Sequence, residues 1–203
     1  MELLIGQLLS AVIQVMFFSF LPLLLWIFRG RKKEGFFSWI GLKSISNNDR
    51  KKVLFFSSIT LFVFIVLSVY LLFLLKDIQL ATSEFDGIGI TALPAAIVYS
   101  FIKTGLSEEI LFRGFILKGL LNKMNFTLAN AIQSILFGLL HGVMFFNFVN
   151  PIITFIIIAL TGAIGWFMGY INEKKANGSI LPSWIIHGLS NLFASMVAMF
   201  SIL

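Results

Sequence analysis

Long apolar stretches constrain the fold of this chain more than any other feature of its sequence. An apolar run of about 18 residues or more with few charges is typical of a transmembrane helix, because about 20 helical residues cross the hydrocarbon core of a bilayer. Such segments occur at residues 3–28, 53–75, 87–121, 126–146, 152–171 and 179–203. The sequence therefore predicts an all-α fold, a polytopic transmembrane helical bundle of about six membrane spans.

The composition agrees with a membrane protein and excludes several kinds of chemistry. Hydrophobic residues make up 59% of the chain and charged residues 12%, against about 25% charged in a soluble domain. The chain has no cysteine, which excludes disulfides, cysteine-ligated metals and thiol nucleophiles. The net charge of +6 lies mostly beside the spans, where it orients the chain. We therefore expect the lipid bilayer as a partner and no nucleic acid.

The positive charges cluster in every second loop, which places nearly all of them on one side of the membrane. They lie between the first and second spans, from Arg29 to Lys52, and around the turn after the third span, at Arg113, Lys118 and Lys123. Lys174 and Lys175 follow the fifth span. Only Lys76 lies on the opposite side. The positive-inside rule then predicts a multi-pass membrane protein with both termini outside. We divide the chain into residues 1–86, two helices with a basic cytoplasmic loop, and residues 87–203, the remaining spans.

Two adjacent acids lie in the third apolar segment. Ionisable side chains at membrane depth are costly, and those that occur there are candidates for function. Glu109 and Arg113 are four residues apart with the acid first, the favourable order for an ion pair within a helix. Glu108 points about 100° away from Glu109 and is then the freer carboxylate. An interfacial helix with a solvated salt bridge would explain this motif equally well on its own.

The only two histidines also lie in apolar spans, each with a polar or aromatic residue four positions away. His141 follows Phe137, and His187 precedes Asn191, so each pair shares one helix face. Either pair alone could be a hydrogen-bonded clasp between helices. Counting 1.5 Å per residue from the cytoplasmic turns places Glu108, His141 and His187 at similar depths, roughly 14–21 Å in. Their convergence favours one functional site in the cytoplasmic half of the bundle.

These three motifs, in this order and on separate helices, resemble those of the CAAX protease and bacteriocin-processing family of intramembrane proteases, which includes the type II CAAX prenyl endopeptidases. The resemblance covers residues 87–203, which it implies to be a catalytic core, and it suits an enzyme of the bacterial plasma membrane. It implies an intramembrane endopeptidase that cleaves membrane-associated or lipidated peptides with a water activated by glutamate and histidine.

The resemblance and the residues together suggest a division of roles. Glu108, removed from water, would act as general base, and His141 would hold and polarise the attacking water. His187 and Asn191 would form an oxyanion hole. Glu109, Arg113 and Phe137 would support the site. We expect no cofactor, with zinc held by Glu108, His141 and His187 as the alternative, since two imidazoles and a carboxylate form a reasonable zinc set.

Two other functions fit parts of the sequence. A non-enzymatic bacteriocin-immunity or scaffolding protein could use the polar residues as a structural clasp. A small transporter could place a proton site at the membrane midplane, although the chain lacks the internal repeat common in transporters. Loss of the biological phenotype on Glu108→Gln, at normal membrane levels, would distinguish an enzyme from a scaffold.

Overall fold

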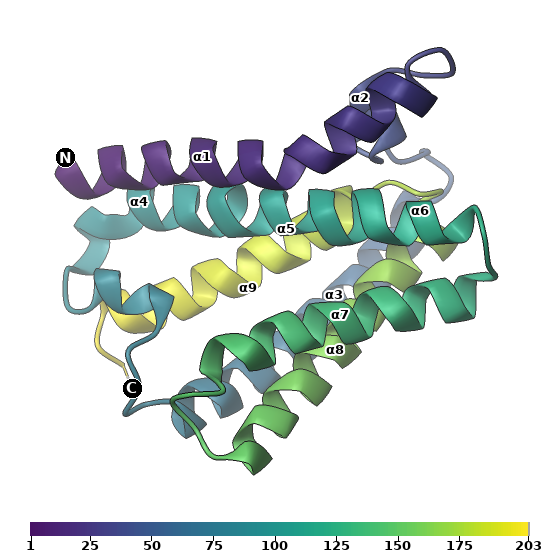
Figure 1. Cartoon of the computed structure of the whole chain (residues 1–203). Helices are drawn as coiled ribbons and strands as arrows, with labels where there is room; N and C mark the ends of the chain where they lie inside the picture. Colours follow the sequence, from purple (N-terminus) through teal and green to yellow (C-terminus); the bar gives the residue numbers. More distant parts are fainter. Residues whose placement is uncertain (203) are drawn as a thin grey trace.

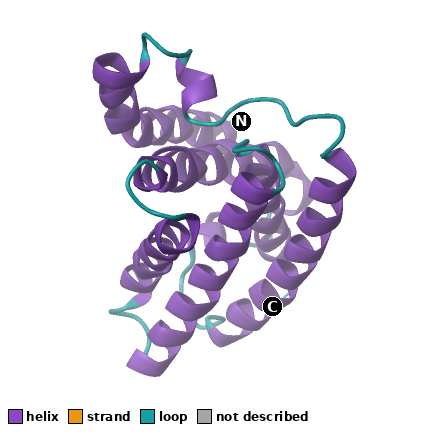
Figure 2. Cartoon of the chain, turned by 90° about the vertical axis from the view of Figure 1, so that its right-hand side faces the viewer, coloured by secondary structure: helices purple, strands orange, loops and turns teal. Residues whose placement is uncertain are grey.

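The computed structural model describes residues 1–202, which fold into helices joined by loops and turns (Figures 1 and 2). The helices are α1 (Glu2–Leu25), η1 (Trp26–Gly30), α2 (Phe36–Trp39), α3 (Arg50–Leu74), η2 (Ala81–Phe85), η3 (Gly89–Ala92), α4 (Leu93–Ile97), η4 (Val98–Leu106), α5 (Ser107–Glu109), η5 (Ile110–Leu117), α6 (Lys118–Leu121), α7 (Phe126–Phe145), α8 (Pro151–Lys174) and α9 (Leu181–Met199). The predicted all-α fold is confirmed. No strand forms between residues 1 and 202.

Five helices of the described chain are long and apolar enough to cross a membrane. They are Glu2–Gly30, Arg50–Leu74, Gly89–Leu121, Phe126–Phe145 and Pro151–Lys174. The sixth predicted span is α9, which is 19 residues long but carries serines, His187 and Asn191 on its buried side. These polar residues explain why α9 is not among the five. The predicted span reached residue 203, which lies outside the described residues.

The elements from η3 to α6 follow one another as a continuous helical path through the bundle (Figure 1). We call this path the central helix, residues 89–121. It packs between α1 on one side and α9 on the other, while α7 and α8 form an antiparallel hairpin (Figure 1). Both termini lie at the same end of the bundle, on the left in Figure 1. The arrangement is that of a multi-pass bundle in which polar residues of the central helix face neighbouring helices.

Hydrogen bonds of turns and loops fix both ends of the bundle. At the turn between α7 and α8, on the side of the termini, Asn150 accepts a hydrogen bond from the Ile153 N–H at 3.0 Å, and Pro151 begins α8, since proline suits the first helical turn. At the opposite end the Lys118 ammonium donates to the Gly178 carbonyl at 2.7 Å. The Ile180 N–H donates to the Gly41 carbonyl at 2.9 Å. The last two bonds attach the α2–α3 loop and the α8–α9 loop to the end of the central helix.

Glycines allow α7 and α8 to approach closely. A Cβ atom added to Gly138 would lie 2.4 Å from the Ile158 carbonyl oxygen, and one added to Gly169 would lie 2.0 Å from Asn130 Oδ1. Small residues serve this purpose in membrane helices, where packing and not the hydrophobic effect drives association. The same interface contains Gln133, which donates to the Gly165 carbonyl at 3.1 Å. Close packing therefore holds the hairpin that carries His141.

We expect Gly138→Ala to destabilise the protein by about 1–3 kcal/mol, because the added methyl must push α7 away from the backbone of α8. The measurement is thermal unfolding of the detergent-solubilised protein. Gly119→Ala is the matched control, since nothing lies within 4 Å of its added Cβ and alanine favours a helix over glycine. Equal unfolding temperatures for Gly138→Ala and the wild type would contradict the close approach.

Candidate active site

The two adjacent acids occupy α5, a short α-helical turn between the π-helical stretches η4 and η5. In a π-helix the hydrogen bonds join residues five apart, and such stretches often mark functional sites within longer helices. The change of helical type widens the central helix on both sides of Glu108 and Glu109. Glu109 is fully buried, and the Glu108 side chain is 14% exposed. The freer carboxylate expected from the sequence is thus also the one that solvent or substrate can reach.

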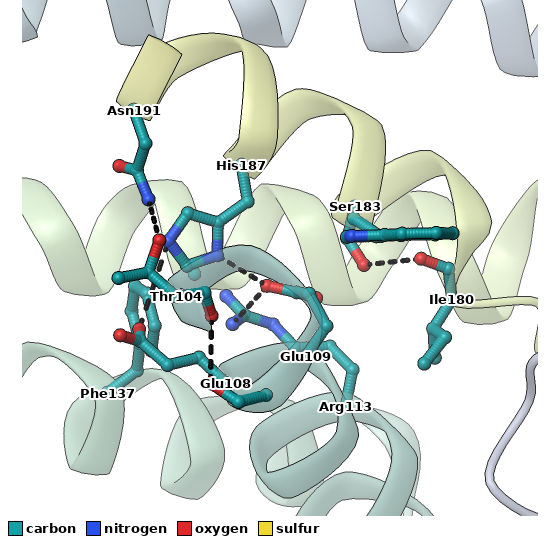
Figure 3. A network of polar contacts seen from close by, with 12 residues as sticks. Thr104, Glu108, Glu109, Arg113, Phe137, Ile180, Ser183, His187 and Asn191 are labelled. Carbon is teal, nitrogen blue, oxygen red and sulfur yellow. Dashed lines mark hydrogen bonds and ion pairs between the residues drawn. The ribbon is translucent and has the colours of Figure 1, made fainter. Parts of the chain in front are cut away.

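Glu109 forms the centre of a buried charge network (Figure 3). Its Oε1 accepts from Arg113 Nη1 at 2.9 Å and from His187 Nδ1 at 3.0 Å. The predicted ion pair with Arg113 is therefore present, and both partners are completely buried. The bond to His187 was not predicted. Because a carboxylate can only accept, His187 must donate from Nδ1, which fixes the orientation of the imidazole ring.

The other ring nitrogen of His187 faces Glu108. His187 Nε2 lies 3.8 Å from Glu108 Oε2, too long for a direct hydrogen bond but short enough for both atoms to contact one small molecule. Glu108 Oε2 is buried and has no hydrogen-bond partner among residues 1–202. A buried acceptor without a partner is unfavourable for stability alone. The pair can therefore hold a proton or a water molecule between a carboxylate and an oriented imidazole.

Phe137 brings the remaining predicted residues together. Its ring centroid lies 4.5 Å from that of His141 and 5.9 Å from that of His187, and the Arg113 guanidinium stacks on it at 4.2 Å. His141 Nδ1 lies 2.9 Å from the Phe137 carbonyl, an acceptor, so Nδ1 donates and Nε2 is left free. The two histidines thus share one aromatic neighbour, although they come from α7 and α9.

Asn191 is tied to the central helix by a residue that the sequence analysis missed. Asn191 Nδ2 donates to Thr104 Oγ1 at 2.7 Å (Figure 3). Thr104 precedes Glu108 by four residues, a spacing that places both on one helix face and could have identified it. The Asn191 amide has a second N–H, which this bond leaves available. The structure thus gathers all seven predicted site residues, but it joins Asn191 to Thr104 and not to His187.

The predicted zinc set does not form a compact ligand group. No three histidine, aspartate or glutamate side chains between residues 1 and 202 are placed to hold one metal ion. His187 does have the carboxylate partner on its second nitrogen that metal-bound histidines usually have. The zinc set therefore stays a prediction, to be tested by chelation.

The comparisons with known proteins assign a family. Residues 90–193, just over half of the 203-residue chain, match the family described as type II CAAX prenyl endopeptidase Rce1-like. This range contains Glu108, Glu109, Arg113, Phe137, His141, His187 and Asn191. No curated protein and no solved structure matches the chain significantly. The chain therefore belongs to the type II CAAX prenyl endopeptidase Rce1-like family.

Proposed function

We propose that the protein is an intramembrane endopeptidase that cleaves lipidated, CAAX-type peptides or proteins with a water activated by Glu108. The observation that carries the proposal is the unpaired, buried Oε2 of Glu108 beside an imidazole that a second carboxylate orients. The family description names a CAAX prenyl endopeptidase. In such substrates a prenylated cysteine is followed by three C-terminal residues, and the enzyme releases those three.

Peptide hydrolysis needs a base for water and a donor for the developing oxyanion. Glu108 would take a proton from water as the oxygen attacks the scissile carbonyl, and would then pass that proton to the leaving amine. His141, whose Nε2 is free, would accept a hydrogen bond from the same water and align it. Each of these groups would act on the water or on the substrate without a covalent intermediate on the protein.

The oxyanion would be bound by the groups of α9. His187 donates from Nδ1 to Glu109, which orients the ring, and donation from Nε2 to the oxyanion would use the doubly protonated imidazole. The second N–H of the Asn191 amide would supply the other hydrogen bond. Donors fixed before the reaction stabilise charge that develops in the transition state. The role of Glu109 would then be to orient His187 through its bond to Nδ1, in addition to its bond with Arg113.

The orientation in the membrane follows from the charges at the loop end. The basic loops, from Arg29 to Lys52 and at Lys118, Lys174 and Lys175, would face the cytoplasm. A lipidated substrate would enter from the inner leaflet with its folded part at this end. Its C-terminal residues would then point along the central helix, towards Gly89. Both termini of the chain would lie outside, consistent with their position at one end of the bundle (Figure 1).

A purified-protein assay tests the function and the metal question together. We expect the wild-type protein to cleave a farnesylated fluorogenic peptide with three residues after the cysteine, at the same rate with and without a strong chelator. Cleavage lost with chelator and restored by zinc would contradict the metal-free mechanism and assign Glu108, His141 and His187 as metal ligands. No cleavage of lipidated peptides would contradict the peptidase and favour the immunity or scaffolding function.

A further inference from the structure

Lys103 is a charged residue near the middle of the central helix, the longest of the membrane-spanning helices. The span runs from Gly89 to Leu121, so Lys103 lies 14 residues from one end and 18 from the other. At 1.5 Å per residue both ends are about 20 Å or more away, beyond the reach of a lysine side chain. A charge at this depth is costly and usually has a functional partner.

The groups around the Lys103 ammonium are neutral. Its Nζ donates to Gln7 Oε1 at 3.3 Å and lies 5.4 Å from the centroid of the Tyr99 ring. Gln7 is buried in α1, which runs beside η4 (Figure 1). No carboxylate of residues 1–202 lies within ion-pairing distance of Nζ. The neighbours thus hold the ammonium in place by an amide oxygen and a ring face without neutralising its charge.

The spacing of Lys103 and Glu108 matches the length of a C-terminal tripeptide. They are five positions apart, which is at most about 7.5 Å along the helix axis. The π-helical bonds of η4 join residues five apart, which brings the two positions nearer to one face than α-helical turns would. Three extended residues span at most about 10 Å. With the scissile carbonyl beside Glu108, a carboxylate three residues further on would come within reach of the Lys103 side chain, which lies on the α1 side of the central helix.

We propose that Lys103, held by Gln7 and Tyr99, binds the C-terminal carboxylate of the substrate. This inference rests on the peptidase function proposed above. In the orientation given there, the C-terminus of the substrate enters deepest, where its carboxylate needs a cation and Lys103 needs an anion. The subsite would restrict cleavage to a fixed distance from a free C-terminus. It would also give α1, which lies outside the matched range of 90–193, a part in substrate recognition.

Two lipopeptides test the subsite, identical except that one ends in a carboxylate and the other in a carboxamide. The quantity measured is the ratio of their kcat/KM values, acid over amide. We expect a ratio of roughly 10–100 for the wild type, the range of a charged hydrogen bond. Lys103→Met should bring the ratio close to 1, and Lys103→Arg should largely preserve it. The change should appear mainly in KM, since the carboxylate is far from the reacting bond.

Lys123→Met is the matched control, since Lys123 is exposed in the turn before α7 and its loss should leave the ratio unchanged. A wild-type ratio near 1, or an undiminished ratio in Lys103→Met, would overturn the subsite while the peptidase function stands. If Lys103→Met does not accumulate, Lys103→Gln replaces it and the same ratio decides. No wild-type cleavage of either peptide would instead overturn the proposed function, and the subsite with it.

Discussion

Replacement of Glu108 by glutamine is expected to lower kcat for lipopeptide cleavage by roughly 10²–10⁴-fold, the usual contribution of a general base. Glutamine keeps the size and shape of the side chain but cannot accept the proton of the attacking water. The Glu108 side chain is only 14% exposed, and its Oε2 has no partner among the described residues. Its replacement therefore removes no hydrogen bond that holds the fold.

The comparison of Glu108→Gln with the wild type needs a measurement of folding and a control substitution at another glutamate. Glu108→Gln should reach normal membrane levels and unfold at a temperature close to that of the wild type, so the loss of activity can be assigned to chemistry. Glu84→Gln is the control, because Glu84 lies exposed in η2 and takes no part in the site. A Glu108→Gln protein that cleaves at the wild-type rate would contradict the assignment of Glu108 as the general base. The water would then have to be activated by His141 or His187.

The sequence alone predicted the five apolar helices that qualify as spans, and it picked out residues that lie close together between the helices. Hydropathy and length define the apolar helices, and counting residues from the turns is enough to bring Glu108 level with His141. These arguments work because a membrane helix has a fixed rise and a known thickness to cross. The contribution of each residue to catalysis stays a prediction.

The cross-helix partners could not be predicted in this way. Glu109 bonds to His187, 78 residues away in the chain, and Asn191 bonds to Thr104, 87 residues away. Spacing rules describe pairs within a helix, so they found Glu109 with Arg113 and missed the second bond. Which faces of two helices meet depends on packing, here on the glycines that bring the central helix against α9, where a Cβ atom added to Gly105 would lie 3.6 Å from the Cα atom of Gly188. The two bonds emerge only when that packing is known.

Loss of the Glu109 carboxylate is expected to have the largest effect on stability. Glu109→Leu leaves both Arg113 and His187 buried without their acceptor, and breaking a buried ion pair by removal of one partner costs about 3–5 kcal/mol. Arg113→Met removes only one of the two donors, and Glu109 keeps its bond to His187. We therefore expect both variants to unfold more easily in denaturant than the wild type, with Glu109→Leu the less stable of the two.

The double variant Glu109→Leu/Arg113→Met shows whether the two residues act as a pair. Replacing both partners of a buried ion pair by apolar residues of similar volume is often close to neutral, so the combined loss should be smaller than the sum of the single losses. The Lys118–Glu173 pair serves as the control. Its atoms lie 3.2 Å apart, and its side chains are 21% and 16% exposed, against 0% for Glu109 and Arg113. Glu173→Gln therefore leaves a partner that water still reaches, and it should cost less than Glu109→Leu. Strictly additive losses for Glu109 and Arg113 would contradict their coupling, and would make the His187 bond the main reason for a buried acid at position 109.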